Sequence, residues 1–138
     1  MAGCATTTTT NTTTAAEVAS VEVAVNDETL RVLVADDPAE RTEGLRNIEQ
    51  LPAGIDGMLF VFPDSTVPTF VMLDAVIPLD VWFFDDDGEL IGSAAMQPCA
   101  EEPCPRYPAP GEVRWALETP LGTRQYQPGD ILTTSASG

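Results

Sequence analysis

One stretch, from Gly57 to Phe84, concentrates the apolar residues of this chain and limits what it can fold into. Three runs within it, Met58–Phe62, Phe70–Leu73 and Leu79–Phe84, are rich in β-branched and aromatic residues, and each is ended by Pro, Asp or Gly. They predict three core strands. Because the stretch contains no nucleophile–base pair, metal-ligand cluster or phosphate loop, it predicts architecture and no particular reaction.

Alternating polar and apolar residues predict further strands on both sides of this stretch. Val21–Val25 and Leu30–Val34 alternate across a short polar turn and predict a β-hairpin with one buried face. Glu112–Glu118 alternates so that its apolar members, Val113, Trp115 and Leu117, face the core. The turn residues 127–130 then lead into a last short strand at Ile131–Leu132.

A single helix is predicted between the hairpin and the apolar stretch. Asp37 has the properties of an N-cap, and Pro38 suits the first helical position. The helix is expected to run to about Asn47. Arg41 and Arg46 lie on it or at its end, and we interpret both as exposed helix charges.

An acidic segment, Asp85–Glu89, joins two of the predicted strands. Three consecutive Asp before Gly88 suggest a calcium loop, but the alternating ligand spacing and the closing Glu of an EF-hand are absent. A tight hairpin turn with Gly88 at positive φ explains the segment better. No metal site is predicted here.

The charge balance excludes several classes of function. The chain has 22 acidic and 6 basic residues, a formal net charge of −16 and no histidine. Such a field repels nucleic acid and anionic lipid, so no nucleic-acid partner is expected. Without histidine the commonest general base and zinc ligand is missing, and acid–base chemistry would depend on carboxylates. No cofactor is predicted.

The first residues are similar to the end of a bacterial lipoprotein signal. A small residue, Gly and then Cys4 precede a Thr-rich polar run, so Cys4 is a candidate for lipidation; the alternative is an accidental cysteine in a disordered leader. We expect residues 1–20 to be this start and a flexible spacer, 21–132 one β domain and 133–138 a frayed tail. The protein is then a monomer at the bacterial cell envelope, attached to the membrane only through its lipid.

Two further cysteines, Cys99 and Cys104, lie in a proline-rich segment. With no histidine and no other cysteine pair, a zinc site there lacks ligands. In an exported protein the two cysteines are expected to form a disulfide. On a chain-entropy estimate this bond stabilises the folded state by about 2 kcal/mol. Cys4 is then the odd cysteine.

An ordered set of short motifs, spread from about Val21 to Leu132, resembles the family catalogued as domain of unknown function 192. The resemblance implies a compact, mainly antiparallel β-barrel or sandwich with one short α-helix, often exported. The family has no established activity, so no reaction is implied. The motifs are Glu40–Leu45, Leu51–Pro52, Gly57–Phe62, Phe70–Met72, Ile77–Val81, Gly88, Pro98–Cys99, Cys104, Tyr107, Leu117–Glu118 and Gly129–Asp130.

The chain departs from the family pattern close to Phe70. That pattern reads Phe-Trp-Met-Lys-Asn-Thr, whereas this chain has Val71, Leu73, Asp74 and Ala75 at the Trp, Lys, Asn and Thr positions. A ligand that depends on the lysine in relatives is therefore not expected to bind this chain in the same way.

The leading functional hypothesis is a lipid-tethered envelope domain that binds a small ligand, a glycan or a partner protein. Side chains on or beside the central strands are the candidates to line the mouth of a small barrel. The simpler interpretation is that the aromatic residues fill the core. The candidates are Phe70, Met72, Asp74, Asp80 and Trp82.

Two alternatives come from other classes of protein. In a carboxylate hydrolase, Asp74 and Asp80 would converge as an acid–base pair; Asp80 at a strand start is more simply explained as a cap for backbone N–H groups. In a purely structural or assembly module, the acidic surface keeps the domain soluble. No catalytic residue is assigned.

Overall fold

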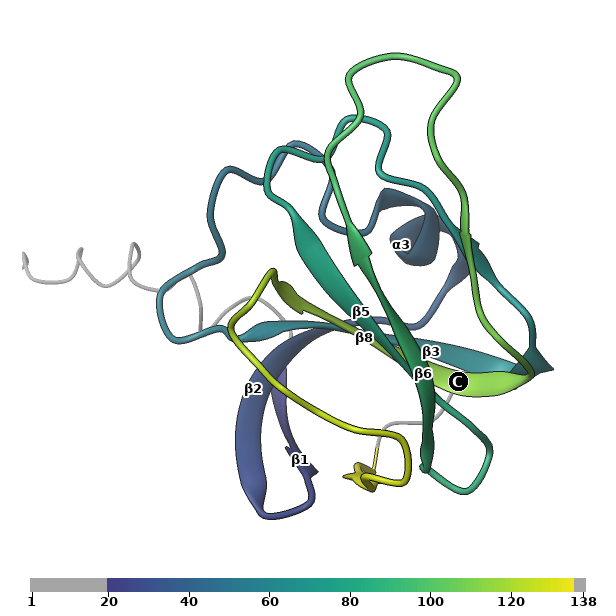
Figure 1. Cartoon of the computed structure of the whole chain (residues 1–138). Coiled ribbons are helices and arrows are strands. Elements are labelled where there is room, and N and C mark those ends of the chain that lie inside the picture. The colour runs from purple at the N-terminus through teal and green to yellow at the C-terminus, as the bar shows by residue number, and fades with distance from the viewer. Residues whose placement is uncertain (1–19, 136–138) are drawn as a thin grey trace, which may run out of the picture.

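The computed structural model describes residues 20–135, and one curled sheet of seven strands dominates them (Figure 1). The strand order is β6-β5-β8-β3-β2-β1-β9. β2 and β3 run parallel, while the other neighbours are antiparallel, so the predicted mainly β, mainly antiparallel class is confirmed. The strands are β1 Ser20–Val25, β2 Glu28–Ala35, β3 Gly57–Thr66, β5 Leu79–Phe84, β6 Leu90–Met96, β8 Val113–Pro120 and β9 Leu132–Thr133.

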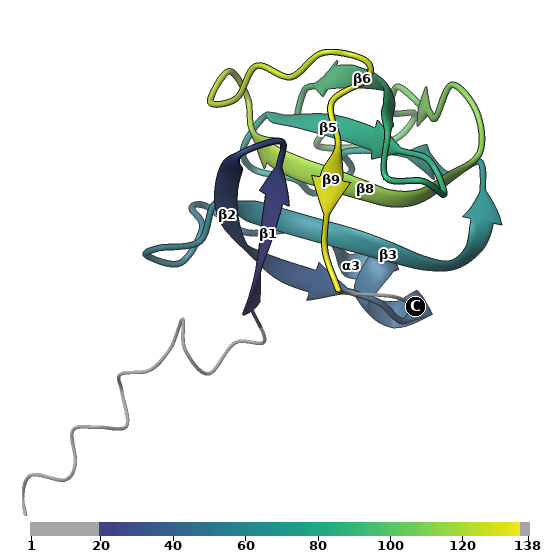
Figure 2. The ribbon, with the colours of Figure 1, turned by 90° about the horizontal axis from the view of Figure 1, so that it is seen from below.

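The sheet curls until its two edge strands meet at one end. The Leu90 N–H at the start of β6 donates to the Asp130 carbonyl at 2.8 Å, and the Leu132 N–H of β9 donates to the Gly88 carbonyl at 2.7 Å. Figure 2 shows β9 lying beside β1. Gly88 has a φ of 82°, and a Cβ there would lie 2.7 Å from the Leu132 carbonyl oxygen. Closure at this point therefore requires glycine.

Both faces of the curled sheet are buried, which explains the uninterrupted apolar runs Met58–Phe62 in β3 and Val81–Phe84 in β5. Tyr126, from the loop before β9, packs against the buried strand residues of the inner face. Those residues are Val23, Val25, Leu30, Val32, Leu59, Val61, Trp82, Phe84, Leu90, Leu117 and Leu132. On the outer face, side chains of the central strands pack under the helix and the long loops: Met58, Phe60, Leu79, Val81, Phe83, Met96 and Ala116, with Leu45 and Met72 above them.

The predicted helix is present as α3, Pro38–Glu43, on the outer face of the sheet (Figure 1). Asp37 caps it as predicted, accepting a hydrogen bond from the Glu40 N–H at 2.7 Å. The helix is shorter than the expected extent to Asn47. It ends because Gly44 turns the chain at a φ of 51°, and Asn47 itself has a φ of 61°.

The segment after β3 differs from the prediction of a third core strand over Phe70–Leu73. Only β4, Thr69–Phe70, is extended, and it pairs with β7, Tyr107–Pro108, in a separate two-stranded sheet. The rest of the run forms a loop that covers the outer face and buries Met72. Leu73 still makes an isolated β-bridge with Cys99, and Asp74 then turns the chain with a left-handed φ of 66°.

The other local predictions are confirmed. β1 and β2 form the expected hairpin, with Val25 paired to Glu28. The acidic segment is a tight turn in which the Gly88 N–H donates to the Asp85 carbonyl at 2.9 Å. The last strand, β9, follows the predicted turn but spans Leu132–Thr133, one residue later than the predicted Ile131–Leu132. No helix among residues 20–135 is long and apolar enough to cross a membrane.

Candidate ligand-binding cleft

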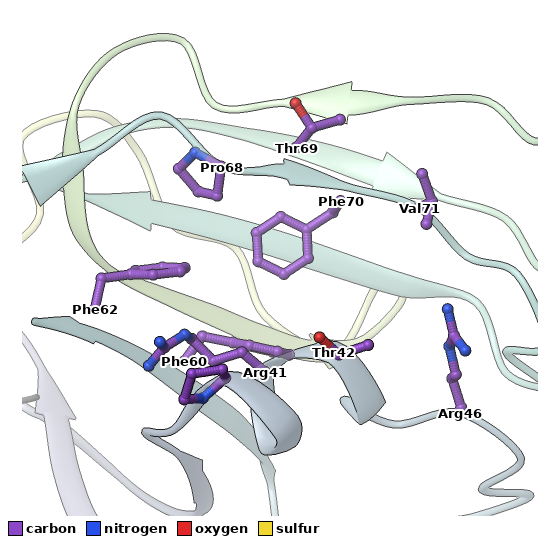
Figure 3. Close-up of a pocket in the computed structure, with 10 residues that line it drawn as sticks. Arg41, Thr42, Arg46, Phe60, Phe62, Pro68, Thr69, Phe70 and Val71 are labelled. Carbon is purple, nitrogen blue, oxygen red and sulfur yellow. The ribbon is translucent and has the colours of Figure 1, made fainter.

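A cleft of about 440 Å³ lies between α3 and the β4 segment on the outer face of the sheet (Figure 3). Residues 38–46 form one wall, residues 68–71 the other, and β3 the base. None of the lining residues is acidic, although the chain as a whole has a net charge of −16. The lining residues are Pro38, Arg41, Thr42, Arg46, Phe60, Phe62, Pro68, Thr69, Phe70 and Val71.

Aromatic rings make the apolar surface of the cleft. Phe60 is buried, and the ring of Phe70 meets it edge-on, with the ring centroids 5.1 Å apart and the planes at 88°. Phe70 also contacts Phe83 of β5, with 5.8 Å between ring centroids. Because the ring of Phe70 is packed against both rings, the apolar surface is formed before any ligand binds.

Two arginines supply the positive charge of the cleft. Arg41 is held in place: its guanidinium donates to the Val61 carbonyl at 2.9 Å and lies 5.5 Å from the centre of the Phe62 ring. Arg46 is half-buried, and its side chain makes no hydrogen bond or ion pair with any residue in the range 20–135. Figure 3 shows Arg46 beside Val71 at the end of the cleft. Its guanidinium donors are therefore available to a ligand.

Three of the other four arginines are paired with carboxylates, and the fourth, Arg106, is exposed in the proline-rich loop. Arg31 contacts Glu22 at 3.1 Å, and Arg114 contacts Asp86 at 2.8 Å. Arg124 contacts both Glu28 and Asp56 at 3.3 Å. Within the part of the chain that the structure describes, neither Arg41 nor Arg46 has a carboxylate within 4.0 Å, so the cleft keeps a local positive charge.

A second, smaller chamber of about 50 Å³ lies behind the cleft and shares Arg41, Arg46, Phe60 and Phe70 with it. Its floor includes Glu118 of β8, whose exposed fraction is 4%. Burial raises the pKa of the Glu118 carboxyl from 4.5 to about 8. This carboxyl has no hydrogen-bond or ion-pair partner among the described residues.

The position of Glu118 follows from the strand register. On β8 it lies between Met58 of β3 and Val81 of β5, so its side chain shares the buried outer face with theirs. Met58, Val81 and Leu79 are all apolar and buried, and they offer the carboxyl no partner. The chamber thus has one polar group in its floor and arginines at its entrance.

The residues predicted from the sequence to form a site are only partly brought together. Phe70 lines the cleft, and Met72 lines the chamber behind it. Trp82 lies on the inner face, where its Nε1–H donates to Thr119 Oγ1 at 3.0 Å. These side chains therefore do not form one mouth.

The two aspartates of that set have separate surroundings. Asp80 points to the inner face, like Trp82, and accepts a hydrogen bond from the Gly122 N–H at 2.9 Å, the capping role considered above. Asp74 is exposed in the loop over the outer face, where its N–H donates to the Cys99 carbonyl at 3.0 Å. The structure does not bring these carboxylates together.

Sequence reasoning missed Arg41, Arg46 and Glu118 as site residues. The arginines were interpreted as exposed helix charges, but both are half-buried over the aromatic base. Glu118 occupies one of the polar positions of a strand that alternates polar and apolar residues. Such a position ordinarily predicts a side chain that faces solvent. The available signal was the apolar run Val81–Phe84, because a strand buried on both faces leaves its neighbours buried on both faces too.

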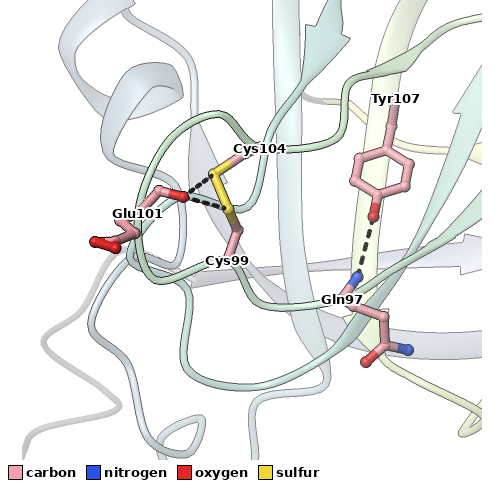
Figure 4. Close-up of a disulfide and its surroundings, with 5 residues drawn as sticks. All are labelled: Gln97, Cys99, Glu101, Cys104 and Tyr107. Atoms are coloured by element: carbon pink, nitrogen blue, oxygen red, sulfur yellow. Dashed lines mark hydrogen bonds between the residues drawn. A yellow bond between two sulfur atoms is a disulfide. The ribbon is translucent and has the colours of Figure 1, made fainter.

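The predicted disulfide between Cys99 and Cys104 is present in the loop above the chamber (Figure 4). Nearby, the Gln97 N–H donates to the Tyr107 hydroxyl at 3.3 Å and ties the base of this loop to β7. The loop forms a third hollow, of about 480 Å³, with Val71 and Leu73, and its own charged residues there are Glu102 and Arg106. Cys4, the candidate for lipidation, lies outside the described residues.

The fold and cleft define a small curled-sheet protein with a cationic, aromatic pocket on its outer face. The chain belongs to the family DUF192, described as "Uncharacterized ACR", which matches residues 8–133. No protein among the curated sequences matches it.

Two crystal structures have the same fold. One, a Novosphingobium aromaticivorans protein of unknown function, is 28% identical, with a TM-score of 0.73 over 83% of this chain and 85% of that one. The other is a Sinorhizobium meliloti protein, described provisionally as a transcription regulator. It is 27% identical, with a TM-score of 0.74 over 83% of this chain and 93% of that one.

Proposed function

We propose that the cleft between α3 and β4 binds a small organic anion whose apolar part lies against the phenylalanines. The observation that supports this most directly is the half-buried guanidinium of Arg46, which has no partner within residues 20–135 of a strongly acidic chain. A carboxylate or phosphate is the group that such a fork of donors recognises best.

The two arginines have different parts in this proposal. Arg41 is fixed by Val61 and Phe62, so it contributes positive potential without rearrangement. Arg46 pairs with the anionic group of the ligand, and the edge-on pair Phe60 and Phe70 takes the apolar group. The negative field of the rest of the surface disfavours anions elsewhere, so binding is confined to the cleft.

Fluorine NMR titration with 4-fluorophenylacetate tests the proposal, with the neutral 4-fluorophenylacetamide as the matched probe. We expect the anion to bind and the amide to bind about tenfold more weakly, because a charge-assisted hydrogen bond is lost. Arg46→Gln removes this difference, whereas Arg31→Gln, at an exposed arginine paired with Glu22, keeps it. Equal binding of both probes to the unmodified protein contradicts the proposal.

The same proposal includes an exported domain that is tethered to the cell envelope through a lipid on Cys4. The Cys99–Cys104 disulfide supports an oxidising compartment outside the cytoplasm. Labelling of the full-length protein in a bacterial host with an alkyne analogue of palmitate tests the tether. We expect label on the protein and none on its Cys4→Ser variant; label on both variants, or on neither, contradicts lipidation at this residue.

A further inference from the structure

The chamber behind the cleft has a polar floor that the function proposed above does not use. Glu118 is 4% exposed and lines this chamber, and its carboxyl makes no hydrogen bond or ion pair with residues 20–135, although its oxygens are not among the fully enclosed atoms that lack a partner. A buried polar group without a partner is costly, because it loses its hydrogen bonds to water. Natural proteins satisfy most such groups, so an unsatisfied carboxyl at the bottom of a pocket indicates a ligand position.

The size of the chamber limits what can reach Glu118. Its volume of about 50 Å³ accommodates one or two water molecules or a small polar group, and excludes an aromatic ring. The larger cleft, at about 440 Å³, takes the rest of the ligand. Because the two spaces share Arg41, Arg46, Phe60 and Phe70, one molecule can occupy both.

Charged groups around the chamber determine which small group fits. From α3 and the turn after it, Arg41, Glu43 and Arg46 line the chamber. The sheet beneath contributes Phe60 and Leu79, and Met58 and Val81 flank Glu118 on the neighbouring strands. The covering loop contributes Phe70, Val71, Met72, Leu73 and Ala75, and none of these side chains titrates. Glu118 is not within ion-pair distance of either arginine, so neither arginine compensates an ionised Glu118 directly.

We propose that the protonated carboxyl group of Glu118 donates a hydrogen bond to a carbonyl oxygen of the ligand whose anionic group pairs with Arg46. This inference rests on the proposed function and names the ligand class more closely: an organic anion with an apolar group and a carbonyl group. Burial supports it, because the raised pKa of about 8 keeps Glu118 protonated at neutral pH. Above that pKa the ionised carboxylate and the carbonyl oxygen are both acceptors, and the bond is lost.

Matched pairs of fluorinated probes that differ only in C=O against CH₂ test this directly. The first pair is 4-fluorophenylglyoxylate and 4-fluorophenylacetate. The second is 3-(4-fluorobenzoyl)propionate and 4-(4-fluorophenyl)butyrate, in which the carbonyl lies farther from the carboxylate. We expect the carbonyl compound of at least one pair to bind about fivefold more tightly at about pH 6.5, and the ratio to fall to about one at about pH 9.5.

Two variants of Glu118 assign the effect to this residue. Glu118→Gln keeps an N–H donor but does not titrate, so its preference for the carbonyl compound should be the same at both pH values. Glu118→Leu removes the donor and should bind both members of a pair equally. Circular dichroism and thermal unfolding establish that each variant is folded.

The outcomes separate this inference from the proposed function. If anionic probes bind in a manner that depends on Arg46 but neither pair shows a carbonyl preference at about pH 6.5, the role of Glu118 is wrong and the cleft proposal stands. A preference that Glu118→Leu retains also overturns the role of Glu118. If no anionic probe binds the unmodified protein, both proposals fail.

Discussion

The ring of Phe70 in the β4 segment meets the ring of Phe60 in β3 edge-on, with 5.1 Å between their centroids. Phe70 also contacts Phe83 of β5. These contacts attach the loop over the outer face to the central strands of the sheet. One aromatic residue thus both anchors the loop and forms a wall of the cleft.

Replacing Phe70 should lower both the stability of the fold and the affinity for the ligand. We expect Phe70→Ala to lower the free energy of unfolding by about 2 kcal/mol, less than for a fully buried ring because Phe70 is half-buried. Urea denaturation measures the loss, and 4-fluorophenylacetate should bind the variant more weakly. Val71→Ala, at the exposed neighbour, is the control and should change stability by no more than about 0.5 kcal/mol. Equal losses would show that the loop is not attached through Phe70.

The buried carboxyl of Glu118 predicts a pH-dependent stability difference. Since its pKa rises from 4.5 unfolded to about 8 folded, the native state holds a proton that the unfolded state has released between these values. The free energy of unfolding of the wild type should therefore fall relative to that of Glu118→Gln as pH rises between these two pKa values. The fall is at most about 1.4 kcal/mol per pH unit. Above the folded-state pKa the difference between the two proteins should be constant.

Chemical denaturation at several pH values between about 5 and 9 measures this difference. Glu112→Gln, at an exposed carboxylate in the segment preceding β8, is the matched control and should follow the wild-type pH dependence. The assignment is wrong if Glu118→Gln and the wild type show parallel curves across the whole range.

Gly57 is the residue at which a single methyl group should be least tolerated. A Cβ added there would overlap the backbone carbonyl oxygen of Glu118 on the neighbouring strand. We expect Gly57→Ala to destabilise by about 3 kcal/mol or more, because two central strands must separate. Gly111→Ala, whose added Cβ would lie 3.6 Å from Ile91 Cδ1, should change stability little. Thermal unfolding of both variants measures the contrast, and similar transitions would contradict it.

The disulfide should stabilise the loop without determining the fold. It joins residues at a sequence separation of 5, and a loop this short gives about 2 kcal/mol on a chain-entropy estimate. We expect the Cys99→Ser/Cys104→Ser double variant to unfold at lower denaturant concentration, with unchanged far-ultraviolet circular dichroism. Loss of the β signal would instead show that the sheet depends on the bridge.

Local patterns were sufficient to predict most of the elements. The cap at Asp37 and the turn at Gly88 each depend on residues within a few positions, so the sequence alone contains their physical cause. The disulfide followed from cysteine spacing and the absence of other ligands. The mainly β class followed from the apolar runs, because their many β-branched and aromatic residues favour strands over helices.

Local patterns could not predict how these elements are arranged in space. Phe70 and Trp82 both lie in apolar runs, yet they belong to opposite faces of the sheet, because only strand pairing decides which face a residue occupies. Glu118 alternates like an exposed residue, and its burial depends on loops that cover the outer face. The candidate site is built from such long-range relationships, and for this reason sequence reasoning found only Phe70 and Met72 of it.

The parallel pairing of β2 with β3 also has a consequence for how the protein folds. Two parallel neighbours need a crossover, and residues 36–56 make it across the outer face with α3 inside it. Arg41 and Arg46 lie on this crossover, while Glu118 comes from β8, much later in the chain. Binding competence therefore depends on contacts of high sequence separation, and a partly folded chain with only its early hairpin has no cleft.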